Sequence, residues 1–170
     1  MNGDELRAAQ APLKDRYRSE PGAALVTLRA EGTLGSEAIA CSVQTGRGLV
    51  EAGLHPATGG DGSLACSGDM LLDALVACAG VTLRSVATSR GLGVVTGTVR
   101  AEGDLDFRGT LGVDRDAPVG FAAIRLTFEL DSDAPAEDVD ALIATTERYC
   151  VVYQTLAGAT EMSISRASPS

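Results

Sequence analysis

The chain has 170 residues, of which 45% are hydrophobic, and this is enough for one domain with a buried core. Its formal net charge of −9 opposes binding to nucleic acid or to an anionic membrane surface, because both are themselves negative. There is neither a basic N-terminal region followed by an apolar run nor a stretch of about 18 uninterrupted apolar residues. We therefore expect a cytoplasmic protein without a signal peptide, a membrane-spanning helix, or nucleic-acid or membrane partners.

The first part of the chain predicts one helix and several short strands. Residues 1–20 form an N-terminal helical region in which Pro12 is an interruption. Three strands are expected next, over 24–31, 38–44 and 49–54. A turn at 32–35 separates the first two strands, and a Gly-rich loop over 55–68 leads into the next helix.

The helix expected over 69–90 is apolar on nearly every side. Its apolar residues are Met70, Leu71, Leu72, Ala74, Leu75, Val76, Ala77, Cys78, Val81, Leu83 and Val86. A helix without a polar face must be covered all round, which is difficult within 170 residues. The pattern predicts that a second subunit supplies part of the cover.

The second half of the chain predicts two long strands and another long helix. Strands are expected over 94–107 and 120–130, a helix over 135–157 and a short strand over 161–166. The last four residues, 167–170, form a Ser/Pro tail that we expect to be mobile. Because strands follow one another in runs, the order favours a single α+β domain over residues 1–170 with antiparallel pairing.

Four cysteines and one histidine limit the chemistry that the chain can perform. The cysteines are Cys41, Cys66, Cys78 and Cys150. They form no C-x-x-C pair, so we expect no metal site and no bound cofactor. Cys41 lies in an alternating strand, and we assign it no function. In a reducing compartment, paired thiols are more often redox-active than structural.

Cys78 and Cys150 are the candidate redox pair, although they are 72 positions apart in the chain. Cys78 lies too far along its helix for the helix dipole alone to lower its pKa, and burial raises the pKa of a thiol. A reactive Cys78 therefore needs a cation or a strong hydrogen-bond donor beside it. The alternative is that both cysteines only fill space in the core.

Two segments resemble the OsmC/Ohr family of osmotically inducible protein C and organic hydroperoxide resistance proteins. Residues 59–78 look like the loop and central helix of that family, and residues 147–153 look like its second cysteine segment. The order of elements agrees as well, so the resemblance covers about residues 20–166. The resemblance implies an OsmC-like fold, with antiparallel sheets around two long buried helices in an intertwined homodimer.

The activity that the resemblance implies is the reduction of organic hydroperoxides, in oxidative stress defence. Cys78 matches the peroxidatic cysteine, whose thiolate becomes a sulfenic acid. Cys150 matches the resolving cysteine, which condenses with it to a disulfide. A dithiol reductant then restores both thiols, and in the hydroperoxide-resistance branch this is typically a lipoyl group on a partner protein.

The sequence departs from this family at the start of the central helix. Relatives with strong peroxidase activity carry Asn-Pro-Glu there, and the Glu holds an activating Arg; this chain has Ser67-Gly68-Asp69. Asp69 is the candidate replacement for the Glu, and Arg18 and Arg29 are candidates for the Arg. His55 is a candidate donor or source of positive charge. The chain therefore looks closer to an OsmC-like branch than to the well-defined reductases.

Three functions stay open at this point. The first is a peroxidase that uses Cys78 and Cys150, and the second is a binding or redox-sensing protein on the same fold, whose thiols are oxidised without turnover. In the third, the protein is a dimeric scaffold without thiol chemistry. Cys66, at the start of the central helix, is either a second resolving thiol or a packing residue.

Overall fold

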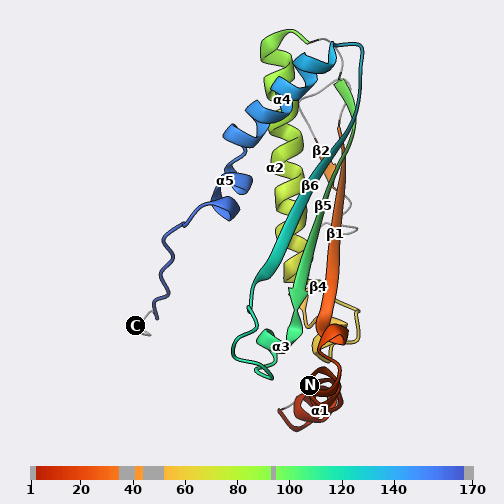
Figure 1. The fold of residues 1–170 in the computed structure, drawn as a ribbon, viewed down its shortest axis with the longest axis vertical. Coiled ribbons are helices and arrows are strands. Elements are labelled where there is room, and N and C mark those ends of the chain that lie inside the picture. The colour runs from red at the N-terminus through yellow and green to blue at the C-terminus, as the bar shows by residue number, and fades with distance from the viewer. Residues whose placement is uncertain (1–2, 35–40, 44–51, 93–94, 167–170) are drawn as a thin grey trace.

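The computed structural model describes residues 3–34, 41–43, 52–92 and 95–166 (Figure 1). Its helices are α1 (Gly3–Ser19), α2 (Ser67–Arg90), α3 (Phe107–Thr110), α4 (Ala136–Tyr149) and α5 (Val151–Ala157), with short 3-10 turns at Pro21–Ala24 and Pro56–Thr58. Its strands are β1 (Leu25–Leu34), β2 (Cys41–Val43), β3 (Ala52–Gly53), β4 (Ala65–Cys66), β5 (Val95–Asp106) and β6 (Phe121–Ser132).

Four strands form one antiparallel sheet in the order β2-β1-β5-β6. The three long strands β1, β5 and β6 run side by side along most of the molecule (Figure 1). A separate pair, β3 and β4, is parallel and lies before α2. The prediction of a mixed α and β fold with antiparallel pairing is confirmed.

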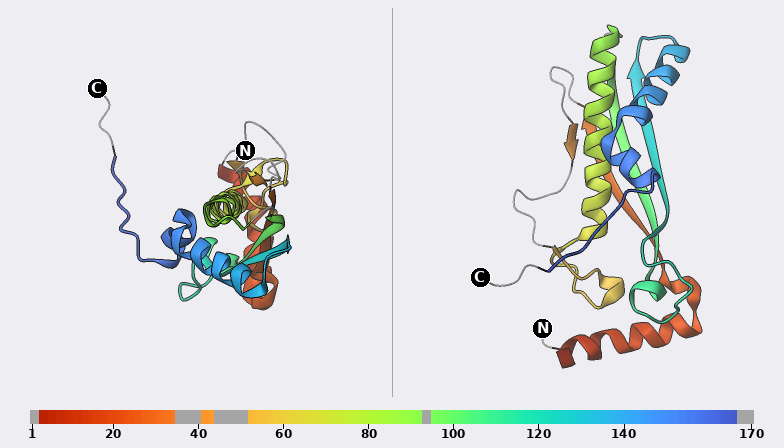
Figure 2. Two further views of the ribbon diagram at one scale, coloured as in Figure 1. Left: turned by 90° about the horizontal axis from the view of Figure 1, so that it is seen from above. Right: turned by 90° about the vertical axis from the view of Figure 1, so that its left-hand side faces the viewer.

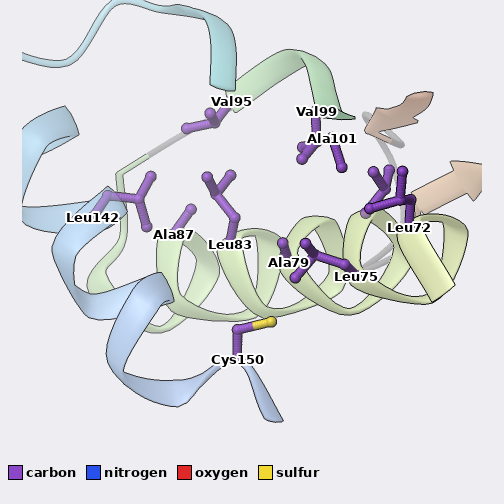
Figure 3. Close-up of a cluster of buried hydrophobic side chains, with 11 residues drawn as sticks. Leu72, Leu75, Ala79, Leu83, Ala87, Val95, Val99, Ala101, Leu142 and Cys150 are labelled. Carbon is purple, nitrogen blue, oxygen red and sulfur yellow. The ribbon is translucent and has the colours of Figure 1, made fainter. Parts of the chain in front are cut away.

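Helix α2 runs along the sheet and forms the centre of the core. Gly91 ends it at φ +66°, a left-handed conformation that glycine adopts easily. The ribbons of β5, α4 and α5 all run beside α2 (Figure 2). Side chains of β5 meet α2 on one side, and the Cys150 side chain meets it on another (Figure 3). The α2 residues buried in this cluster are Leu72, Leu75, Val76, Ala79, Leu83 and Ala87.

One side of α2 stays open to solvent in the single chain. Met70 is 39% exposed, Leu71 38% and Val81 41%, although all three are apolar. By length and composition alone α2 is a candidate membrane span, but 44% of its apolar window is buried. A core helix passes the same test, and its contacts with the sheet, α4 and α5 favour that interpretation.

The structure corrects three details of the sequence-based prediction. The turn expected at 32–35 is wrong at its start, because Gly32 and Thr33 continue β1 by pairing with β5 and Leu34 pairs with β2. The helix expected over 135–157 is broken at Cys150 into α4 and α5. Residues 161–166 form no strand and are exposed, since none of the residues that the structure describes pairs with them.

Several expectations fall on residues outside the described ranges. They concern parts of the predicted strands at 38–40, 44, 49–51 and 94, and the tail at 167–170.

Candidate active site

The fold brings Cys78 and Cys150 together. Cys78 lies near the middle of α2 and is partly buried, whereas Cys150 lies at the junction of α4 and α5 and is fully buried. The Cys150 side chain points toward α2 (Figure 3). Cys78 packs against the core cluster that contains Cys150, and the two thiols are close enough to shift each other's pKa, with Cys150 as the donor to Cys78. Both are free thiols in this structure.

The break between α4 and α5 places Cys150 at this position. Its backbone is extended, at φ −72° and ψ 108°, so the helix cannot continue through it. Its N–H donates to the Thr146 carbonyl at 2.8 Å, which closes α4. Its sulfur accepts the Tyr153 N–H at 3.5 Å, which caps α5. Cys150 therefore ends one helix and begins the next.

A second link between the two helices supports this junction. The Gln154 side chain donates to the Glu147 carbonyl at 2.9 Å, and the Tyr153 hydroxyl donates to the Glu147 carboxylate at 3.1 Å. Residues on both sides of Cys150 are thus bonded to each other. These bonds hold the start of α5 at a fixed place beside α2.

The environment of Cys78 stabilises its thiolate. Burial raises the pKa of this thiol, but hydrogen bonds from the Val152 N–H, the Cys150 thiol, the Thr82 hydroxyl and the Val151 N–H outweigh that effect. The pKa of Cys78 is consequently below the ordinary thiol value. These donors are neutral. The Cys78 thiolate is therefore stabilised by hydrogen bonding, one of the two possibilities that were expected from the sequence.

Cys150 has the opposite environment. Burial raises its pKa to about 11, and the hydrogen bond and negative charge of Cys78 act in the same direction. At neutral pH, Cys150 therefore keeps its proton while Cys78 is the more acidic thiol. A pair of this kind provides one nucleophile and one neutral thiol that donates a hydrogen bond to it.

A groove of about 290 Å³ lies between α2, β6 and α5, and it is lined by neighbours of the two cysteines but by neither cysteine itself. Leu75, one helical turn before Cys78, contributes to it from α2, and Tyr153, which bonds Cys150, contributes from α5. The other lining residues are Phe121, Ala122, Ala123, Ile124, Leu126, Leu156 and Ala157. The groove can hold a small organic group beside Leu75 and Tyr153.

Two of the predicted supporting residues lie at the N-terminal end of α2, away from the pair. Nine residues separate Asp69 from Cys78, which is a rise of about 14 Å along the helix. Burial raises the pKa of Asp69, and the nearby His55 lowers it, so these two are neighbours. His55 also stacks on Phe107 with ring centroids 4.9 Å apart. Cys66 and His55 line a separate pocket of about 400 Å³.

Among the contacts that the structure describes, none joins Arg18 or Arg29 to Cys78. Arg18 is exposed on α1 and forms an ion pair with Asp15 at 2.7 Å. Arg29 lies in β1, where its backbone pairs with Glu102, and its side chain is outside the described part of the structure.

Three donors to Cys78 were not predicted from the sequence. Val151 and Val152 act through their backbone N–H groups, so no side-chain pattern reveals them. Thr82 was detectable, because it follows Cys78 by four residues and therefore shares its helical face. Within the described residues, no three His, Cys, Asp or Glu side chains are grouped so as to hold a metal ion.

Comparison with known proteins gives a family match and a structural neighbour. The family model for OsmC-like protein matches residues 60–165, more than half of the chain. The crystal structure of an OsmC-like hydroperoxide resistance protein from Jannaschia sp. CCS1 aligns with a TM-score of 0.54 at 17% identity. The alignment covers 82% of this chain and 91% of that chain, and at this identity it supports the fold alone. No curated protein matches the chain.

Proposed function

Because this chain belongs to the OsmC-like protein family, we propose that it is a thiol-dependent peroxidase that reduces organic hydroperoxides with Cys78 and Cys150. The observation that carries the proposal is that the fold brings these two thiols, 72 positions apart in the chain, into one cluster, where their pKa values shift in opposite directions. One thiol is prepared to ionise, and the other is held beside it in the neutral form. This is the arrangement that a peroxidatic and a resolving cysteine need.

In the first step, the Cys78 thiolate attacks the terminal oxygen of the hydroperoxide. A sulfur–oxygen bond forms, the O–O bond breaks, and the alkoxide takes up a proton and leaves as the alcohol. Cys78 is oxidised to a sulfenic acid, and the hydroperoxide is reduced by two electrons. The donors around the sulfur favour this step because they stabilise the ionised thiol that attacks.

In the second step, the Cys150 sulfur attacks the sulfenic sulfur of Cys78. The S–S bond forms, the S–O bond breaks, and the oxygen leaves as water with the proton of Cys150. A dithiol then reduces the disulfide and is itself oxidised to a disulfide. A lipoylated protein is the candidate reductant.

The groove lined by Leu75 and Tyr153 supports an organic rather than an inorganic peroxide. Hydrogen peroxide gains nothing from apolar walls, whereas an alkyl or aryl group loses contact with water when it enters the groove. Two of its walls come from Leu75 and Tyr153, each three positions from one of the cysteines in the sequence. The groove therefore favours hydroperoxides with a compact hydrophobic group.

A homodimer in the cytoplasm belongs to the same proposal. The exposed apolar side of α2 and the extended segment after α5, where Met162 is 88% exposed, are surfaces that a second copy can cover. A cytoplasmic setting supplies the reducing conditions that recycling of the pair requires.

The test is turnover of cumene hydroperoxide with dihydrolipoamide as reductant. We expect the wild-type protein to consume the peroxide catalytically and Cys78→Ser to abolish consumption, because the nucleophile is lost. Cys66→Ser is the matched control and should keep the activity, since Cys66 is the N-cap residue of α2, 12 positions before Cys78. Unchanged turnover in Cys78→Ser would overturn the proposal.

The second candidate is a redox sensor that is oxidised once without turnover. It is favoured by the neutral character of the donors around Cys78 and by the position of Asp69 away from the pair. Oxidation by one equivalent of peroxide, with no recycling by any dithiol, would select it over the peroxidase.

A further inference from the structure

The groove and the pocket described above follow one another along α2 and β6. Leu75 lines the groove of about 290 Å³, whereas Leu71, one helical turn earlier on α2, lines the pocket of about 400 Å³. On the opposite side, Gly120 lines the pocket and Ala122 of β6 lines the groove. Among the residues that the structure describes, Phe121 alone lines both spaces. Phe121 therefore stands between them.

A glycine on the neighbouring strand gives the Phe121 ring its place. A Cβ atom at Gly103 of β5 would lie 2.6 Å from Cδ1 of Phe121 and closer still to Cε1, so the ring fills the space that a side chain at position 103 would need. Val99 and Ala101 of β5 belong to the core cluster around α2, and Gly103 follows them in the same alternation. The ring therefore lies on the α2 side of the sheet.

The pairing of β5 with β6 is irregular beside this ring. Leu105 pairs with Phe121, whereas the residue before Leu105 pairs with Ala123, so the register skips Ala122. A bulge of this kind bends the strand and redirects the side chains next to it. Phe121 is half-buried and packs against the core cluster. Strand geometry and packing together hold the ring between the groove and the pocket.

The groove by itself is small for a ligand site. Sites for small molecules commonly have volumes of about 300 to 1,000 Å³. A compact group fits the 290 Å³ groove, but a longer chain must pass Phe121 to reach further apolar walls. Leu71, Leu105 and Phe107 provide such walls in the pocket beyond. The position of the ring therefore decides whether the second space is available.

We propose that Phe121 sets the upper length of the hydrophobic group that the groove accepts, because its ring separates the groove from the pocket. The proposal deepens the proposed peroxidase function and rests on it for the class of substrate, an organic hydroperoxide. Phe121 is a specificity-determining residue in this account and takes no part in the chemistry at Cys78. Removal of the ring joins the two spaces and admits a longer chain.

The experiment measures the binding of straight-chain primary alcohols, from butanol through hexanol and octanol to decanol, to the reduced protein by isothermal titration calorimetry. These alcohols are the products that alkyl hydroperoxides leave, and their binding needs no peroxide, reductant or turnover. The variants are Phe121→Ala and the milder Phe121→Leu, which keeps a larger apolar side chain in the core. Phe128→Ala is the matched control, since Phe128 is a half-buried residue of β6 that packs against the same core cluster and lines neither space.

We expect the wild-type affinity to rise from butanol and to level off before decanol, because the ring stops further methylene groups. In Phe121→Ala the affinity should keep rising through decanol, by up to roughly fourfold for each further methylene that enters the pocket. Phe121→Leu should show a smaller extension, and Phe128→Ala should level off where the wild type does. In turnover, kcat/KM for decyl hydroperoxide relative to tert-butyl hydroperoxide should rise in Phe121→Ala and not in Phe128→Ala.

The proposal is wrong if no alcohol binds, if the wild-type affinity rises through decanol, or if the two Phe121 variants level off at the wild-type length. An equal extension in Phe128→Ala would also overturn it, because the effect would then come from a loosened core. A changed alcohol profile with an unchanged ratio of kcat/KM values would show that the substrate does not occupy the groove. A protein that shows the expected alcohol profile but consumes no hydroperoxide would refute the peroxidase function and leave Phe121 established as the wall of a binding groove.

Discussion

At the scale of single residues, the two thiols influence each other. Burial raises the pKa of Cys150, and the neighbouring Cys78 raises it further. The Cys150 thiol in turn helps to lower the pKa of Cys78. The folded protein therefore favours the protonated form of Cys150. The protonated Cys150 thiol contributes to the stability of the fold below the ordinary thiol pKa, and this contribution is lost as the pH rises through about 11.

This coupling predicts the behaviour of Cys150 when its neighbour is removed. In Cys78→Ala, the pKa of Cys150 should fall below about 11 and stay above the ordinary value, because burial remains while the hydrogen bond and charge of Cys78 are lost. The measurement is the pH dependence of alkylation on the tryptic peptide 149–166, which contains Cys150 as its only cysteine.

Cys66→Ala is the control and should leave the Cys150 profile unchanged, since Cys66 is not among the groups that shift its pKa. A Cys150 profile that is identical in Cys78→Ala and wild type would show that the two sulfurs do not interact.

At the scale of elements, α2 has a buried side and an open side. Leu72, Leu75 and Leu83 are at most 1% exposed in the core, whereas Val81 is 41% exposed on the same helix. Apolar side chains left in water favour association with another surface. A second copy of the chain over this side would complete the cover that the sequence pattern demands.

Val81→Lys tests this association. We expect wild-type protein to sediment as a dimer and Val81→Lys to shift toward the monomer, because a charged side chain would be buried in the contact. Ala136→Lys adds the same charge at the exposed start of α4 and should stay dimeric. A wild-type protein that sediments as a monomer at all concentrations would refute the homodimer.

At the scale of the whole molecule, hydrophobic patterning predicted most of the fold. Helices α1 and α2 and strands β5 and β6 lie close to their expected ranges, because each has a long periodic pattern or clear ends such as Gly91. The break at Cys150 was not predictable, since residues 136–157 read as one amphipathic helix. The break depends on packing against α2, which local sequence does not encode.

The candidate site was predictable only in part. The sequence singled out Cys78 and Cys150, but their contact depends on that break and on the docking of α5 against α2. His55 and Asp69 carry suitable chemistry, yet the fold places them at the end of α2, with Phe107. Titratable side chains attract attention in a sequence, whereas backbone donors such as the Val152 N–H become visible only in the folded chain.

The most direct test is to oxidise the reduced protein with one equivalent of cumene hydroperoxide and map its disulfides by mass spectrometry. We predict one intramolecular disulfide between Cys78 and Cys150, with Cys66 left as a free thiol, because only the first two sulfurs are in contact among the cysteine side chains that the structure describes. A disulfide that joins Cys78 to Cys66, or a protein whose Cys78 is not oxidised, would contradict the account.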